Sequence, residues 1–169
     1  VSQLAEQASL AYHRCYAKPF TDQGKHPNVR IAFNGTFWSR SGTGSGQYLA
    51  HLMSALTPAQ SDHELMLLKP AYTGCHGPSA EQRGFVLHEV QTPVDRLAPN
   101  LAKVWFEQLA CPAACRRFGI DLLHVPYFAP PARSPIPVIV TIHDVIPLLL
   151  PEYRRGLGVR AYSRLVTWA

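Results

Sequence analysis

The chain has 169 residues, of which 47% are apolar and 16% are charged, with a formal net charge of +5. This balance predicts one folded domain with a real core and excludes a disordered chain. The longest apolar run, 138–150, contains His143, Asp144 and Pro147, so it is too short and too polar to predict a membrane span. The arginines form pairs and a short cluster, which favours a solvated surface over a nucleic-acid site.

Residues 1–27 are predicted to form a helical N-terminal extension and a linker. Ser2 is a suitable cap, and Leu4, Ala8 and Cys15 lie near one helical face. The chain begins with Val1, shows no signal peptide and ends at Ala169 within a helical pattern. Both ends are therefore interpreted as cut.

Residues 28–169 alternate between strand and helix patterns. The predicted strands are 29–33, 64–68, 85–90, 121–125 and 138–142, and the predicted helices are 47–56, 97–118 and 152–169. A kink or break is expected at Pro112 and a C-cap at Gly119. The last strand is apolar on both faces, as in a central parallel strand. The order predicts an α/β fold with a Rossmann-like, open and mostly parallel sheet that carries helices on both faces.

A glycine loop joins the first strand to the first helix of this domain. Gly42, Gly44 and Gly46 alternate with small hydroxyl residues in the loop 34–46. Glycine lets a backbone approach a ligand closely, and the following helix directs its N–H groups and positive end to the same place. An anion or a set of sugar hydroxyls could bind there. The loop lacks a P-loop lysine and the dinucleotide spacing, so the alternative is a turn without a ligand.

Polar and aromatic residues follow the last two predicted strands, at the sheet edge where ligands bind in such folds. His143 and Asp144 are the candidate catalytic residues, because an imidazole can carry a proton or donate to a phosphate, and a carboxylate can orient it or hold a hydroxyl. The alternative is a structural pair in which Asp144 caps the next turn. Tyr127 is a candidate sugar-stacking residue, with a core position as the alternative. His124 is interpreted as a core histidine bonded to backbone.

The four cysteines fit no disulfide framework and are interpreted as small buried thiols, which favours a reducing, cytoplasmic location. Cys111 and Cys115 share a helix face, but no further ligands stand at a zinc-binding spacing. No metal site is therefore expected.

Several stretches, read together, resemble the N-terminal domain of family 4 glycosyltransferases, which have the GT-B fold. The most specific is TIHDVIPL at 141–148, followed by PEY at 151–153. The others are RIAFN at 30–34 with GTGSGQY at 42–48, WFEQLACP at 105–112 and DLLHVP at 121–126. They occur in the family's order and cover roughly residue 28 to the end.

This resemblance implies one half of a GT-B architecture. Family members transfer a sugar from a nucleotide-sugar donor to an acceptor hydroxyl with retention at the anomeric carbon, and the N-terminal domain mainly holds the acceptor. Carried over, it assigns the loop glycines and Gln47 to substrate binding, and His143 with Asp144 to the cleft wall. No cofactor beyond the donor substrate is implied. The acceptor would be a sugar or a lipid-linked molecule, and peripheral contact with a membrane is a property of many lipid-acceptor relatives.

Two departures from the family pattern matter. Gln47 stands where many relatives have Arg, and no stretch corresponds to the C-terminal domain that grips the diphosphate and carries an E-x7-E motif. Because stabilising the leaving group is a large share of transfer catalysis, the chain alone is expected to have no significant turnover, and the C-terminal domain is expected in cis. The alternatives are a non-catalytic sugar- or nucleotide-binding domain and one subunit of a split transferase. A dehydrogenase is disfavoured by the glycine spacing and by Lys69 and Pro70 at the end of the second strand.

Overall fold

The computed structural model describes residues 28–40, 42–56, 63–73, 85–96, 98–150 and 156–169. The predicted N-terminal helix and linker over 1–27 lie outside these residues.

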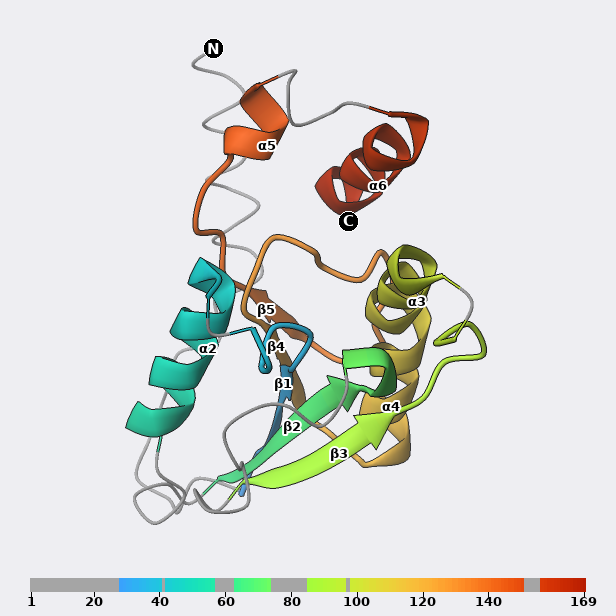
Figure 1. The fold of residues 1–169 in the computed structure, drawn as a ribbon. Coiled ribbons are helices and arrows are strands. Elements are labelled where there is room, and N and C mark those ends of the chain that lie inside the picture. The colour runs from blue at the N-terminus through green and yellow to red at the C-terminus, as the bar shows by residue number, and fades with distance from the viewer. Residues whose placement is uncertain (1–27, 41, 57–62, 74–84, 97, 151–155) are drawn as a thin grey trace, which may run out of the picture.

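Five strands form one parallel sheet (Figure 1). Their order across the sheet is β3 (Val86–Val90), β2 (Glu64–Pro70), β1 (Arg30–Asn34), β4 (Leu122–Val125) and β5 (Val138–Val140). All four neighbouring pairs run parallel, and Ala32 in the central strand pairs with Met66 on one side and Leu123 on the other. The predicted open, Rossmann-like sheet is confirmed.

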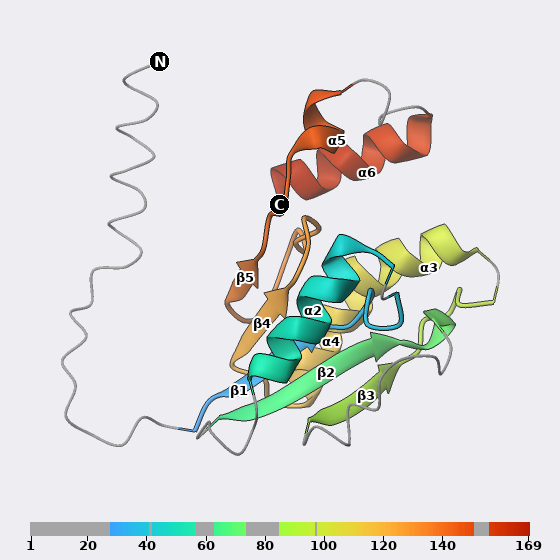
Figure 2. The same ribbon diagram turned by 60° about the vertical axis from the view of Figure 1, so that its left-hand side comes forward.

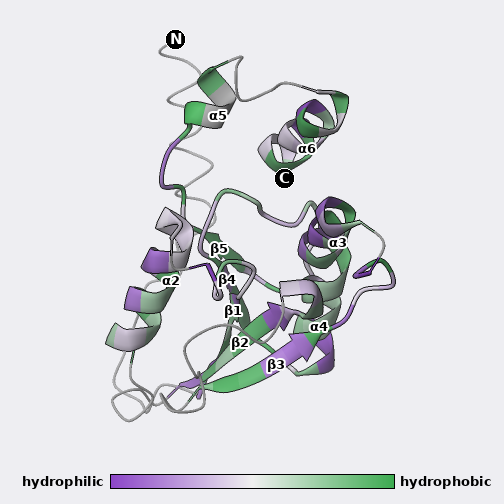
Figure 3. Ribbon diagram, viewed as in Figure 1, coloured by the Kyte–Doolittle hydropathy of each residue, from purple (hydrophilic) through white to green (hydrophobic). Residues whose placement is uncertain are grey.

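Helices cover both faces of this sheet. Helix α2 (Gly44–Ala55) lies on one face, and α3 (Pro99–Trp105) with α4 (Cys111–Arg117) lies on the other (Figures 1 and 2). Adjacent residues of β1 belong to two different hydrophobic clusters, one on each face of the sheet. Phe33 packs in the cluster that contains Leu49 of α2, whereas Ala32 packs in the cluster that contains Phe106. Most of β2 is coloured hydrophobic in Figure 3, as expected for a strand that is buried on both faces.

Strand β5 differs from its prediction. It was expected over 138–142 as a central strand, but it has three residues and lies at the edge of the described sheet, with Ile139 49% exposed. One further ladder bond follows, from the Thr141 N–H to the Val125 carbonyl at 2.9 Å. A β-branched apolar run indicates a strand, but its composition does not determine the position of that strand in the sheet.

The predicted break at Pro112 is wrong, because helical segments follow one another without interruption from Pro99 to Arg117. Instead, a π-helical segment, Phe106–Ala110, joins α3 to α4, and the Cys111 N–H donates to the carbonyl of Phe106, five residues earlier. The wider turn accommodates a proline that lacks an N–H and would crowd the preceding turn of an α-helix. Gly119 then ends α4 with a positive φ of 62°, and the Ile120 N–H bonds to the Cys115 carbonyl at 2.9 Å, which confirms the predicted cap.

Two helices complete the described chain. The short helix α5 (Ile146–Leu149) was not predicted, because its four residues follow a strand pattern without a change in hydrophobicity. Helix α6 (Leu157–Trp168) corresponds to the predicted final helix and lies beyond the carboxyl ends of the strands, next to α3 (Figures 1 and 2). Its Val166 is buried in the core on the α3 side. Among the described residues, no helix is both long and apolar enough to span a membrane.

Candidate functional site

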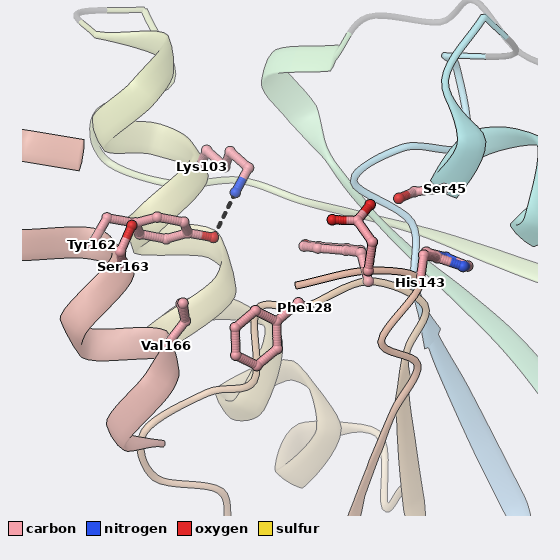
Figure 4. A pocket seen from close by; sticks show the side chains of 9 residues that line it. Ser45, Lys103, Phe128, His143, Tyr162, Ser163 and Val166 are labelled. Carbon is pink, nitrogen blue, oxygen red and sulfur yellow. Dashed lines mark hydrogen bonds between the residues drawn. The ribbon is translucent and has the colours of Figure 1, made fainter. Parts of the chain in front are cut away.

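A pocket of about 270 Å³ lies at the carboxyl ends of β4 and β5, where parallel α/β sheets bind ligands. Its walls come from the start of α2, from α3 and α6, and from the segments that follow the two strands (Figure 4). The lining residues are Ser45, Lys103, Tyr127, Phe128, His143, Asp144, Tyr162, Ser163 and Val166. The pocket therefore brings together parts of the chain that are more than a hundred residues apart.

The start of α2 lies earlier than predicted. Thr43 is the N-cap: its Oγ1 accepts a hydrogen bond from the Gly46 N–H at 3.1 Å, and the helix begins at Gly44 instead of residue 47. A good cap outweighs the low helix propensity of two glycines in the first turn. Gly44 and Gly46 are thus helical, and Ser45 between them lines the pocket.

The three predicted loop glycines have different surroundings. A Cβ atom added to Gly42 or Gly44 would meet no heavy atom within 4 Å, whereas one added to Gly46 would lie 2.1 Å from the Arg40 carbonyl oxygen and 2.9 Å from that of Phe37. Position 46 therefore requires glycine, because the backbone of Phe37 and Arg40 passes too close to leave room for a side chain. Gly42 and Gly44 are exposed, and their backbone is open to an approaching ligand. Gln47 is also exposed and does not line the pocket.

His143 and Asp144 both line the pocket and both have protein partners. The His143 Nε2 lies 3.0 Å from the Pro126 carbonyl oxygen and therefore donates to it, and the ring meets the Tyr48 ring edge-on with centroids 4.9 Å apart. In the neutral imidazole this leaves Nδ1 as an acceptor. Asp144 Oδ1 accepts from the Ile146 N–H at 3.0 Å, a local bond in the turn before α5, which agrees with the structural alternative, although the N-cap residue of α5 itself is Val145.

Tyr127 lies in the core, which was the alternative to sugar stacking. It is 6% exposed, and its ring packs edge-on against Phe37 with centroids 4.8 Å apart. Its hydroxyl donates to Glu107 Oε1 at 2.7 Å and also lies 3.0 Å from Thr36 Oγ1. The neighbouring Phe128 is only partly buried and is the more accessible aromatic ring of the lining.

A buried carboxylate that the sequence did not single out organises one wall of the pocket. Glu107 is 1% exposed, and it accepts hydrogen bonds from Tyr127 at Oε1 and from Tyr162 at Oε2, the latter at 2.8 Å. Lys103, four residues earlier, forms an ion pair with Oε1 and donates to the Tyr162 hydroxyl at 2.7 Å. In the sequence, the four-residue spacing of Lys103 and Glu107 is the feature that could have indicated this ion pair. One carboxylate therefore fixes three lining side chains.

Burial keeps the two tyrosines of this cluster protonated. Loss of hydration raises the pKa of Tyr127 and of Tyr162 well above the ordinary value, and the negative charge of Glu107 adds to the effect. Both hydroxyls therefore remain donors to the carboxylate throughout the neutral range.

His124 lies behind the pocket and differs from its prediction in one respect. Its Nε2 lies 2.8 Å from the Thr141 hydroxyl, so its partner is a side chain and not the backbone. Thr141 also donates to the Tyr48 hydroxyl at 3.2 Å. Burial lowers the pKa of His124, which favours the neutral ring.

Metal ligands do not gather in the described part of the chain, where no three His, Cys, Asp or Glu side chains stand together. Cys111 and Cys115 are both buried and free, in agreement with the interpretation as buried thiols.

Comparison with known proteins gives one family. A sequence model described as Glycosyltransferase Family 4 matches residues 42–169, from the glycine loop through the pocket residues to α6. No curated protein matches the chain significantly.

Proposed function

The chain belongs to glycosyltransferase family 4, and we propose that it forms the acceptor-side half of a retaining transferase, which moves a sugar from a nucleotide-sugar donor to an acceptor hydroxyl. In this reaction the bond between the anomeric carbon and the donor phosphate breaks, and a glycosidic bond to the acceptor oxygen forms. The nucleoside diphosphate leaves and takes up the proton that the acceptor hydroxyl gives up. The observation that carries the proposal is the pocket in which the start of α2 meets His143 and Asp144.

The start of α2 supports a role at the donor phosphates. The positive end of a helix favours negative charge, and this charge increases on the diphosphate as the sugar departs. Gly44 leaves the backbone there open, and Ser45 places a hydroxyl at the pocket. We assign Gly42, Gly44 and Ser45 to this contact, with Gln47 at the exposed flank of the same helix.

His143 and Asp144 support a role at the transferred sugar. The bond from His143 to Pro126 fixes the ring, so that its Nδ1 is available as an acceptor. Asp144 Oδ1 accepts from the Ile146 N–H, and within the described residues no hydrogen bond to Oδ2 is found, so we assign Oδ2 to a substrate hydroxyl. The proposed active protein also contains a nucleotide-gripping C-terminal domain in cis, without which this half does not turn over. The donor sugar and the acceptor bind in the cleft between the two halves.

The test is His143→Ala in the full-length protein, assayed for transfer from a panel of nucleotide-sugars. Loss of a positioned polar contact to the reacting sugar should lower kcat/KM by about tenfold to a hundredfold. The matched control is His51→Ala, because His51 is exposed on α2 and does not line the pocket. Thermal unfolding of both variants shows whether the loss reflects folding. Transfer at the wild-type rate in His143→Ala would remove this residue from the site, and binding of sugars without transfer would favour a non-catalytic binding domain.

A further inference from the structure

The two sides of the pocket differ in their chemistry (Figure 4). Ser45 and His143 lie on one side, near the start of α2, and Lys103, Tyr162 and Ser163 lie on the other, on α3 and α6. The proposed function assigns the donor phosphates to the α2 side. The proposed function assigns no ligand group to the α3–α6 side.

Lys103 does not present an uncompensated charge to the pocket. Its ammonium pairs with Glu107, whose side chain is fully buried, while the Lys103 side chain is 28% exposed. In a poorly hydrated setting the attraction between the two charges is strong, so the field of the lysine is largely cancelled by the carboxylate behind it. An approaching anion meets a neutral pair and not a free cation.

Lys103 still has one N–H without a hydrogen-bond partner among the described residues, although its ammonium also lies over the Tyr162 and Tyr127 rings, 4.5 and 5.6 Å from their centroids. An ammonium has three N–H groups, and those of Lys103 have Glu107 and the Tyr162 hydroxyl as partners within the described part of the chain. The third N–H belongs to a side chain that lines the pocket. A substrate oxygen can accept this hydrogen bond without removing either existing one.

The remaining lining suits hydroxyl groups better than an anion. Lys103 contributes one positive charge, while Asp144 in the lining and Glu107 behind it contribute two negative ones. On the α3–α6 side, the Ser163 hydroxyl can both donate and accept a hydrogen bond. Phe128 adds an aromatic ring of the kind that packs against the apolar face of a sugar.

We infer that the α3–α6 side of the pocket binds an uncharged acceptor sugar, to one of whose hydroxyls Lys103 donates a hydrogen bond. The inference rests on the proposed function, and it names the class of acceptor. Glu107 is a positioning residue, because it acts through Lys103 and does not line the pocket itself. A phosphate- or carboxylate-bearing acceptor group is disfavoured by the net negative charge of these residues.

The test compares matched neutral and anionic probes on the full-length protein. Methyl hexopyranosides and the corresponding hexose 6-phosphates are titrated against the wild type, and binding is followed by saturation-transfer NMR. At least one neutral glycoside should bind more tightly than its phosphate counterpart. Lys103→Met should weaken binding of that glycoside about tenfold, because its hydrogen bond from a charged donor is lost. Arg116→Met, which removes an exposed charge on α4, should leave its binding unchanged.

Two further variants separate the charge argument from folding. Glu107→Gln leaves the Lys103 charge uncompensated and should strengthen binding of the hexose phosphates about tenfold. The double variant Lys103→Met with Glu107→Gln leaves no unpaired buried charge, so it should fold and still lose glycoside binding.

The outcomes also separate this inference from the proposed function. Tighter binding of the phosphates by the wild type, or unchanged glycoside binding in the folded double variant, would overturn the inference even where sugar transfer is measured. Lys103-dependent glycoside binding without transfer from any nucleotide-sugar would support the inference and overturn the enzymatic proposal. Absence of binding of every neutral glycoside would also overturn the inference.

Discussion

Gly44 and Gly46 lie two residues apart on α2, and only one of them is confined by its surroundings. Gly46→Ala should lower the free energy of unfolding by about 1–3 kcal/mol, because the added methyl group collides with backbone that cannot move aside easily. Gly44→Ala is the matched control and should leave stability unchanged or raise it by up to about 1 kcal/mol, since alanine is the better helix former. Urea denaturation measures both. An equal loss in the two variants would contradict the packing role of Gly46.

The raised pKa values of Tyr127 and Tyr162 predict that the free energy of unfolding falls at alkaline pH. The folded-state pKa of Tyr127 and of Tyr162 lies above the unfolded-state value near 10, so the unfolded chain releases these protons first. Their contribution is fully present below pH 10 and is lost as the pH rises above it, by about 1.4 kcal/mol per pH unit for each tyrosine. Denaturation between pH 9 and 11.5 measures the slope, and Tyr162→Phe should make it shallower. The same slope in this variant would show that other groups are responsible.

Individual residues were predictable where they lie close in sequence to a strand end. His143 and Asp144 were identified because they directly follow a strand, and the structure places both in the pocket. Glu107 was not identified from the sequence, because its partners include Tyr162, which is 55 residues away. Tyr127 is joined to Asn34 across 93 residues, so its burial follows from contacts that no local pattern contains.

The elements follow the sequence well where hydrophobic spacing determines them and less well at their ends. Strand β1 and helix α4 end within a residue of the predicted positions, because a glycine or a change of pattern marks the boundary. The start of α2 was misplaced by three residues, since the Thr43 cap permits a helix to begin on glycines. The π-helical segment before Pro112 also could not be foreseen, because proline alone does not determine whether a helix breaks or widens.

Helix α6 is held against the rest of the domain by few buried contacts. Its buried contacts are Val166 and the Tyr162 hydroxyl, whereas Leu157 and Trp168 are largely exposed. Val166→Ala should therefore weaken the docking of α6 by about 1–3 kcal/mol and leave the sheet intact. Hydrogen exchange should show faster exchange in α6 alone, and Thr167→Ala, at an exposed neighbour, should not. Uniformly faster exchange across β1 and β4 would show that α6 is part of the same cooperative unit.

At the scale of the whole molecule, the alternation of strands and helices was sufficient to predict the class of fold. Parallel strands need crossover connections, which helices supply here: α2 joins β1 to β2, and the stretch from α3 to α4 joins β3 to β4. The sequence of β5 did not predict its position at the edge of the described sheet, because the composition of a strand does not determine which other strands pair with it. A pocket lies at the edge of the sheet where the sequence predicts ligand binding, but its α6 wall follows only from the three-dimensional packing of α6.

The separation of the pocket walls along the chain has a consequence for the newly made protein. Ser45 and Ser163 are 118 residues apart, counting from one number to the other, and both line the same pocket. At a translation rate of about 5–20 residues per second, roughly ten seconds pass on the ribosome between the synthesis of the first wall and that of the last. Strand β1 is synthesised before that interval, and α2, β2 and β3 in its early part, whereas β4 and β5 follow in its later part, shortly before α6. The α2 wall of the pocket is therefore made before its α6 wall, and this pocket can form only once α6 has been synthesised.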